Sequence, residues 1–328
     1  MKRVLILVLV LTLMVGVASA ELKVAFSQIG QESDWRTANT DDVKKAIVDA
    51  GWELIYDDAQ QKQENQVKAL RNFITQGVDY IVFTAIVTTG WDDVLAEVKE
   101  AEIPLILIDR LPETAFGNDD WYTCYFGGDF PFEGYKAGMW VKNYFESIGH
   151  TGDINIVRLS GTTGSDPQIG RTAGFDEVVA ANPNMKIVYD QTGNFTRSEG
   201  QAVMEAALKA VPQINVLWAE NDDMALGAIE AIKAAGKVPG KDIIIVGCDA
   251  VKAAFEAIVA GEMNATSECT PLMGARVVEV IKGLEEGQTF EKVLHPVEYV
   301  YDTNGGIVID DENNVSLKAA DHLAERLY

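Results

Sequence analysis

The sequence predicts an α/β protein of two lobes, each built on a doubly wound parallel β-sheet. Three observations predict this. Short β-branched runs alternate with helical patterns along the whole chain, which is typical of parallel sheets. The alternation restarts near residue 129, so the two halves are similar. With 328 residues, the chain is also long for a single hydrophobic core and suits two domains of ordinary size.

The first half of the chain contains four predicted strands before residue 110. Val43, Ile47 and Ala50 recur at helical spacing, and Gly51 ends that first helix. The predicted strands are 23–27, 53–56, 80–83 and 105–108, and the following helices are 65–75 and 91–100. These elements predict the first parallel sheet.

The second half repeats the pattern, and a less regular tail follows it. Its predicted strands are 154–159, 186–190, 216–218 and 243–246, with helices at 132–145, 169–181, 200–210, 224–235 and 252–260. The tail contains a helix at 273–283, a β-rich stretch at 293–301 and a last short helix. We expect residues 21–128 with about 269–299 to form one lobe, and 129–268 with about 300–328 to form the other. Because no Ser- or Pro-rich linker is present, we expect several short crossings, near 127–129, 266–269 and 299–302.

The first twenty residues have the pattern of a secretory signal peptide. Lys2 and Arg3 precede an apolar run over 4–17, and Ala18-Ser19-Ala20 follows as an A-x-A cleavage site. The run is shorter than the roughly 20 apolar residues that span a bilayer, which argues against a membrane anchor. We therefore expect export to the periplasm with cleavage after Ala20.

Charge and motif content exclude several classes of function. The formal net charge of −23 would repel phosphate backbones, so nucleic acid is a poor partner. No nucleophile elbow, P-loop or H-E-x-x-H motif is present, and the histidines are scattered; we therefore predict no enzyme, no cofactor and no metal. Cys124, Cys248 and Cys269 are widely spaced, which leaves open one disulfide or three buried thiols.

Two predicted strands, one in each half, end in an aspartate. Asp109 follows an Ile-Leu-Ile run and Asp249 ends the run Ile-Ile-Val-Gly-Cys. Because ligands of open parallel sheets bind beyond the carboxyl ends of strands, we expect both aspartates to face one crevice. Further polar or aromatic residues lie just past strand ends: Glu32, Ser33, Trp35, Arg36, Arg110, Arg171, Asn221, Asp222 and Asp223. Such a set suits a sugar, whose hydroxyls both donate and accept while its C–H face packs on an aromatic ring.

Less specific interpretations remain for some of these residues. Asp222 and Asp223 are also suited to capping the helix that follows them. Asp109 and Arg110 are also compatible with a surface ion pair, which would contribute little. The two aspartates across a crevice leave a glycosidase as a minor alternative.

At these residues the chain resembles the periplasmic ribose/galactose-type sugar-binding proteins, which have the type I periplasmic binding protein fold. More narrowly, it resembles the galactofuranose-binding components of ABC importers. Matching segments run in order along nearly the whole chain: VAFSQIG (24–30), ESDWR (32–36), QQKQENQ (60–66), TGW (89–91), AEIP (101–104) with Asp109 and Arg110, NFTRS (194–198) and NDDM (221–224).

The resemblance implies two lobes that are joined by a three-segment hinge and close on a monosaccharide. It implies ligand contacts from Glu32, Ser33, Trp35, Arg36, Asp109 and Arg110 in the first lobe, and from Arg171, Phe195, Asn221 and Asp249 in the second, with Glu268 at the hinge. Trp35 and Phe195 would sandwich the ring. It also implies a monomer that delivers galactofuranose or a similar aldose to an ABC transporter permease. A receptor subunit that presents a sugar or autoinducer to a sensor is the alternative, whereas a repressor is opposed by the export signal.

Overall fold

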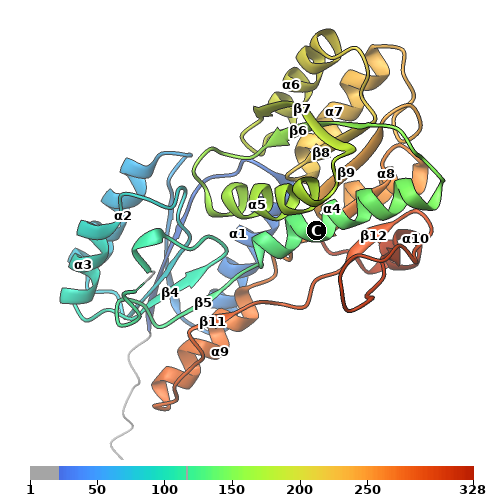
Figure 1. The fold of residues 1–328 in the computed structure, drawn as a ribbon. Coiled ribbons are helices and arrows are strands. Elements are labelled where there is room, and N and C mark those ends of the chain that lie inside the picture. The colour runs from blue at the N-terminus through green and yellow to red at the C-terminus, as the bar shows by residue number, and fades with distance from the viewer. Residues whose placement is uncertain (1–21, 116) are drawn as a thin grey trace, which may run out of the picture.

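The structure is a computed structural model that describes residues 22–115 and 117–328. It contains two α/β lobes connected by three short crossing segments (Figure 1). The predicted signal peptide lies outside the described residues. In Figure 1 the first lobe contains the blue and cyan segments together with helix α9 (Gly274–Glu285) and strand β11 (Val293–Leu294), and the second lobe contains most of the other green to red segments.

The first lobe is built on a six-stranded sheet in which neighbouring strands run parallel. Its strand order is β11-β5-β4-β3-β1-β2. The strands are β1 (Lys23–Gln28), β2 (Glu53–Asp58), β3 (Tyr80–Phe83), β4 (Leu105–Ile108), β5 (Cys124–Phe126) and β11 (Val293–Leu294). Its helices are α1 (Asp34–Asp49), α2 (Gln63–Gln76), α3 (Asp92–Glu100) and α9, with a 3-10 turn at Glu113–Ala115. Strands β3 and β4 are buried throughout, because helices cover both faces of a parallel sheet.

The second lobe is built on a seven-stranded sheet in the order β13-β12-β10-β9-β8-β6-β7. Its strands are β6 (Ile154–Ser160), β7 (Met185–Thr192), β8 (Val216–Ala219), β9 (Ile244–Asp249), β10 (Ala265–Glu268), β12 (Val300–Asp302) and β13 (Leu317–Lys318). Its helices are α4 (Phe130–Ser147), α5 (Asp166–Ala181), α6 (Arg197–Ala210), α7 (Asp222–Ala234), α8 (Lys252–Ala260) and α10 (Ala319–His322), with a 3-10 turn at Leu323–Glu325. Strand β12 pairs antiparallel with β10, and the other pairings in this sheet are parallel.

Three segments connect the two sheets. The first, 127–129, agrees with the prediction. The second, 269–273, follows β10, and the third, 295–299, precedes β12. The predicted crossings at 266–269 and 299–302 were therefore wrong by a few residues, because 265–267 pair with 300–302 in the second sheet. Their mixed polar and aromatic residues gave no alternating pattern from which this strand pair could be predicted.

Helices α4 and α5 pack unusually closely because two glycines lie at their contact. A Cβ atom on Gly134 would collide with the backbone of Arg171, and one on Gly174 would collide with the backbone of Pro131. The neighbouring atoms are backbone, so neither position has a flexible side chain that can move away. This contact fixes α4 relative to the part of α5 that carries Arg171.

We expect Gly174→Ala to destabilise the protein. Alanine favours a helix over glycine by about 1 kcal/mol, but overpacking against backbone costs about 1–3 kcal/mol or more, so the net effect is a loss. Urea unfolding should show a lower midpoint for Gly174→Ala. Gly152→Ala is the control, since its Cβ would meet nothing closer than 3.5 Å. An unchanged midpoint in Gly174→Ala would contradict the close packing.

Candidate functional site

One cavity between the lobes gathers ten of the eleven residues predicted for the site. It contains about 280 Å³ of empty space, a figure that includes space open to solvent. Its lining residues are Glu32, Ser33, Trp35, Arg36, Asp109, Arg110, Pro167, Arg171, Phe195, Asn221, Asp249 and Cys269. The two lobes and the second crossing segment thus all contribute to one small site.

Helix starts bring several of these residues to the cavity. Ser33 caps α1 by accepting a hydrogen bond from the Arg36 backbone N at 3.1 Å. Asn221 caps α7 by accepting from the Met224 N at 2.9 Å. Pro167 lies in the first turn of α5, a position that proline favours. In a parallel sheet, helices start beyond the carboxyl ends of strands, which places these residues at the cleft.

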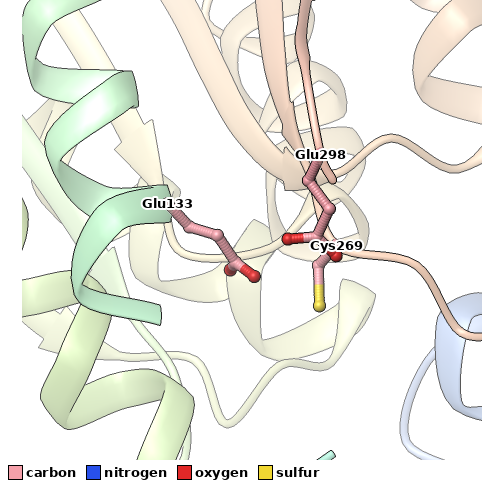
Figure 2. A group of neighbouring side chains, drawn as sticks. All are labelled: Glu133, Cys269 and Glu298. Carbon is pink, nitrogen blue, oxygen red and sulfur yellow. The ribbon is translucent and has the colours of Figure 1, made fainter. Parts of the chain in front are cut away.

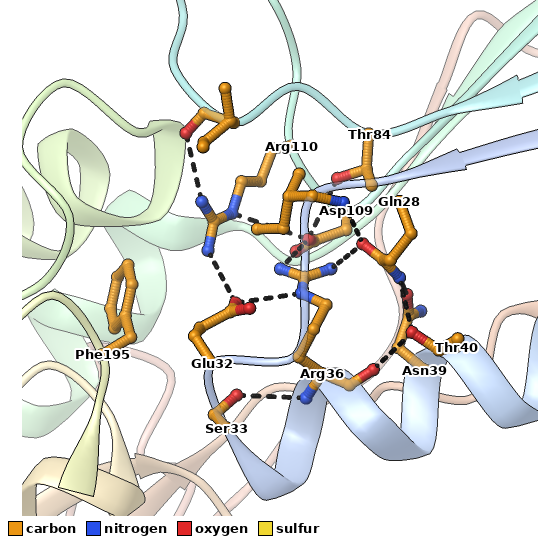
Figure 3. A network of polar contacts seen from close by, with 12 residues as sticks. Gln28, Glu32, Ser33, Arg36, Asn39, Thr40, Thr84, Asp109, Arg110 and Phe195 are labelled. Carbon is orange, nitrogen blue, oxygen red and sulfur yellow. Dashed lines mark hydrogen bonds and ion pairs between the residues drawn. The ribbon is translucent and has the colours of Figure 1, made fainter. Parts of the chain in front are cut away.

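The first-lobe wall of the cavity is a buried network of ion pairs (Figure 3). Arg36 contacts Glu32 at 3.0 Å and Asp109 at 2.6 Å. Arg110 lies 3.5 Å from Glu32 and 3.7 Å from Asp109, and donates to the Ile86 carbonyl at 3.1 Å. Asp109 and Arg110 are only 3% and 2% exposed, so the surface ion-pair interpretation is wrong.

The pKa values of the two arginines in this wall are shifted in opposite directions. Burial lowers the pKa of Arg110 to about 10, and the positive charge of Arg36 adds to this, while Asp109 and Glu32 oppose it. For Arg36, burial also acts downward, but Asp109 and Glu32 outweigh it and raise the pKa. Both side chains are therefore charged at neutral pH. Among the described residues, the buried Nε of Arg110 has no hydrogen-bond partner, and an Asp109 carboxylate oxygen lies 3.7 Å from it.

The second-lobe wall centres on Arg171. Its Nε contacts Glu133 at 2.7 Å, one terminal nitrogen lies 3.2 Å from Asp249, and the other donates to the Glu220 carbonyl. Burial raises the pKa of Asp249, although Arg171 opposes this shift. The guanidinium is thus held at three points with one edge toward the cavity.

Asp109 and Asp249, the two strand-ending aspartates, share a backbone feature. Their φ angles are 59° and 118°, in the region that non-glycine residues rarely adopt. Such conformations cost about 1–3 kcal/mol and cluster at ligand-binding sites. The prediction that both aspartates face one crevice is met by their common place in the cavity lining.

Two aromatic side chains line the cavity from opposite lobes. The Trp35 ring lies under the Arg36 guanidinium at 4.7 Å, and its Nε1 donates to the Cys269 carbonyl at 2.7 Å. The Phe195 ring lies 5.3 Å from the Arg110 guanidinium across the cleft. A Cβ at Gly161 would collide with the Phe195 ring, so only glycine leaves room for this orientation.

Direct contacts join the lobes on two sides of the cavity. On one side, Asp223 of α7 accepts from the Asp34 N at 2.8 Å, and Arg197 contacts both carboxylates at 2.8 Å. On the other, Asp166 accepts from the Leu111 N at 2.9 Å. The structure therefore represents a closed arrangement of the lobes.

Neither Asp222 nor Asp223 is the N-cap residue of α7. Asn221 caps α7, whereas the Asp222 carboxylate accepts from the Val251 N at 3.0 Å and from Thr266 at 2.8 Å. Asp223 forms the contact between the lobes.

Glu268 is the predicted site residue that does not line the cavity. Its carboxylate pairs with Arg326 at 2.7 Å and accepts from the Tyr299 N at 3.1 Å. The next residue, Cys269, lines the cavity instead. Because successive side chains of a strand point to opposite sides, an error of one residue in register separates these two environments.

Several residues of the site were not predicted. Pro167 and Cys269 line the cavity, and Glu133 holds Arg171 from behind it. Nothing in the sequence links Glu133 to Arg171, which is 38 residues away. Cys124, Cys248 and Cys269 are all free and buried, which settles the choice between a disulfide and buried thiols.

Comparison with known proteins identifies the family. A family model described as periplasmic binding protein domain matches residues 24–289. The chain belongs to the periplasmic binding protein family. It is 41% identical over 297 residues to the galactofuranose-binding protein YtfQ of Escherichia coli (strain K12), covering 89% of this chain and 92% of that protein.

Solved structures agree with this assignment. A protein from Mycobacterium smegmatis in complex with β-D-fucofuranose is similar with a TM-score of 0.82 and 48% identity, covering 86% of this chain and 91% of that one. The periplasmic component of an arabinose ABC transporter from Shewanella sp. ANA-3, bound to α- and β-L-arabinofuranose, gives a TM-score of 0.83 and 40% identity, covering 93% and 95%. The predicted family and fold class are confirmed, and the relatives are sugar-binding transport proteins rather than enzymes. Within the described residues, no helix combines the length and apolar character needed to cross a membrane.

Proposed function

We propose that this protein captures a monosaccharide in its furanose form between the two lobes and delivers it to the permease of an ABC importer. The observation that carries the proposal is the convergence of ten predicted side chains from both lobes on one small cavity. The relatives named above bind galactofuranose, fucofuranose and arabinofuranose, which supports a five-membered ring.

The charge of the cavity supports a neutral ligand. Three carboxylates, Glu32, Asp109 and Asp249, face three guanidiniums, Arg36, Arg110 and Arg171. A neutral sugar leaves this balance intact, whereas a charged ligand would leave one buried charge unpaired. Hydrogen bonds from hydroxyls to charged groups are roughly twice as strong as neutral ones.

The proposed ligand contacts follow from the geometry of the lining. Trp35 and Phe195 offer ring faces from opposite lobes, and the unpartnered Arg110 Nε offers a donor. We leave Glu268 out of the ligand-binding set, because Arg326 and the Tyr299 backbone already occupy its carboxylate.

Further parts of the proposal concern the mature protein. We propose export to the periplasm with cleavage after Ala20, and a monomer as the working form. We also propose lobes of 21–128 plus 269–299 and 129–268 plus 300–328. The distribution of the strands between the two sheets supports these ranges.

Calorimetry with ring-locked sugars tests the proposal. We expect saturable one-to-one binding of 1,4-anhydrogalactitol, whose ring is locked as a furanose, and much weaker binding of 1,5-anhydrogalactitol, whose ring is locked as a pyranose. Galactose, arabinose, fucose and ribose complete the panel. Flat titrations with every sugar would contradict the proposed function, and a preference for the pyranose form would contradict the ring assignment.

Sugar affinity should rise as the pH falls from about 7 to about 5. In the closed form, burial raises the pKa of Asp166 from 3.8 to about 6; the Leu111 hydrogen bond opposes this and Asp109 adds to it. In an open form the carboxyl is solvated, so closure takes up a proton between these two values. The protonated form thus favours closure, by about tenfold in affinity at pH 5 relative to pH 7.

The Asp166→Asn variant isolates this effect. Its amide oxygen can still accept from the Leu111 N but does not titrate. We expect calorimetry at pH 5, 6 and 7 to show a flatter profile for Asp166→Asn than for the unmodified protein. Asp153→Asn, an exposed aspartate paired with Lys186, should keep the original profile. Equal profiles in all three proteins would exclude Asp166 as the source.

A further inference from the structure

The three crossing segments meet at a cluster of three potential metal ligands. Glu133 lies in the first turn of α4, directly after the first crossing. Cys269 begins the second crossing, and Glu298 lies in the third. One ligating atom from each lies within 4.8 Å of the others. Figure 2 shows the Glu133 side chain extending from α4 toward Cys269 and Glu298.

One oxygen of this cluster lacks a partner. Glu133 is fully buried, and its Oε2 is occupied by Arg171 at 2.7 Å and by the Cys248 thiol at 3.4 Å. Its Oε1 has no hydrogen-bond partner among the described residues. Leaving a buried charged acceptor unpaired costs more than the roughly 1–3 kcal/mol of a neutral group. The position of Oε1 therefore calls for a positively charged partner.

The surrounding charges balance with a divalent cation. Glu133, Glu298 and Asp249 are three carboxylates, and Arg171 and Lys136 are two cations. If Cys269 binds as a thiolate, four negative charges face two positive ones, and a divalent ion supplies the two that are missing.

We propose that Glu133, Cys269 and Glu298 form a binding site for a zinc-class divalent cation. Thiolate together with carboxylate ligands suits zinc, whereas calcium and magnesium take oxygen ligands. Zinc bonds of about 2.0–2.3 Å hold tetrahedral ligands roughly 3.5 Å apart, and the three atoms here lie within 4.8 Å of one another, so a small approach completes the geometry. No motif in the sequence predicts this site, because its ligands lie in or beside three crossing segments that are far apart along the chain.

The site has a route to solvent that does not pass through the sugar cavity. Glu298 is partly exposed and lines a second cavity together with Asp129 and Lys136. Cys269 faces the sugar cavity from the other side. A bound ion would connect all three crossing segments in the closed arrangement. If the proposed function holds, zinc and sugar must then increase each other's affinity by the same factor.

Metal titration of the sugar-free protein tests the site independently of the sugar. Cobalt(II) serves as the probe for the thiolate ligand: we expect one equivalent to bind with a thiolate-to-metal charge-transfer band in the near ultraviolet. Zinc should displace it. Zinc calorimetry should show saturable binding of one ion per chain.

Conservative variants assign the ligands. We expect Cys269→Ser to abolish the charge-transfer band and Glu298→Gln to weaken zinc binding at least about tenfold. Cys124→Ser, a buried cysteine of β5, and Glu291→Gln, an exposed carboxylate, are the matched controls and should bind as the unmodified protein does. Thermal unfolding in the presence of a chelator checks that each variant is folded.

Two results would overturn the metal site: no cobalt or zinc binding by the unmodified protein, or binding that persists unchanged in Cys269→Ser. The sugar titrations are independent of this outcome, so failure of the metal site leaves the proposed function standing.

Discussion

Replacing Arg171 by lysine should weaken sugar binding by about 100-fold. The Arg171 guanidinium contacts Glu133, Asp249 and the Glu220 carbonyl at the same time. A lysine ammonium keeps the charge but is a single point on a flexible chain, and it cannot reproduce this fork. A single hydrogen bond to a charged group contributes about 1.5–3 kcal/mol. The structure adds the cost of a poorly paired buried carboxylate, which brings the expected loss to about 3 kcal/mol.

Calorimetry with the sugar identified in the panel measures this loss. Arg158→Lys is the matched control, because Arg158 contacts Asp176 at 2.7 Å and Asp190 at 2.6 Å in the same lobe but does not line the cavity. Arg158→Lys should bind sugar normally. Unchanged affinity in Arg171→Lys would remove Arg171 from the site.

Asp109→Asn should reduce both stability and sugar binding. The Asp109 carboxylate accepts from Arg36 at 2.6 Å and from Thr84 at 3.2 Å, and it lies beside Arg110. Without its charge, two buried guanidiniums share only Glu32. Burial already lowers the pKa of Arg110 to about 10, and the negative charge of Asp109 opposes this shift. Removing that charge would lower the pKa of Arg110 further and make its charged form less stable. Breaking a buried pair from one side costs about 3–5 kcal/mol.

Urea unfolding and sugar calorimetry together test this second prediction. We expect the free energy of unfolding of Asp109→Asn to fall by about 3 kcal/mol, and its sugar affinity to fall by more than about tenfold. Asp190→Asn is the control, because Asp190 also pairs with an arginine but is about one third exposed. A stable variant with full affinity would contradict the role of the Asp109 network.

Most strands and helices could be predicted from hydrophobic periodicity. The strands that could not be predicted in this way lack an apolar pattern or are very short. The buried strands β3, β4 and β8 are short apolar runs between helices, so their prediction was direct. Strand β10 reads Ala-Thr-Ser-Glu and has no apolar signature, yet it is fully buried because β9 and β12 pair with it. Strands β11 and β13 have only two residues each and exist through pairing alone.

The site was predicted by two different arguments. The strand-end rule found Asp109 and Asp249, and the family resemblance added Phe195, which follows no apolar strand closely. Neither argument found Glu133, since a carboxylate in a helical first turn looks like ordinary helix capping until α5 packs against it. Glu268 was inferred from the resemblance, but its side chain does not line the cavity, whereas the next residue, Cys269, does. Neighbouring side chains can point in opposite directions, so a shift of one residue changes the environment completely.

The antiparallel pair β10–β12 constrains how the lobes can move. The second crossing leaves from the end of β10 and the third enters at the start of β12, where Ser267 lies opposite Val300. These two crossings are therefore anchored side by side at one end, so they leave the second lobe from a common place. The first crossing is not part of this strand pair, and it contains Gly127 and Gly128, where the surrounding atoms leave no room for a side chain.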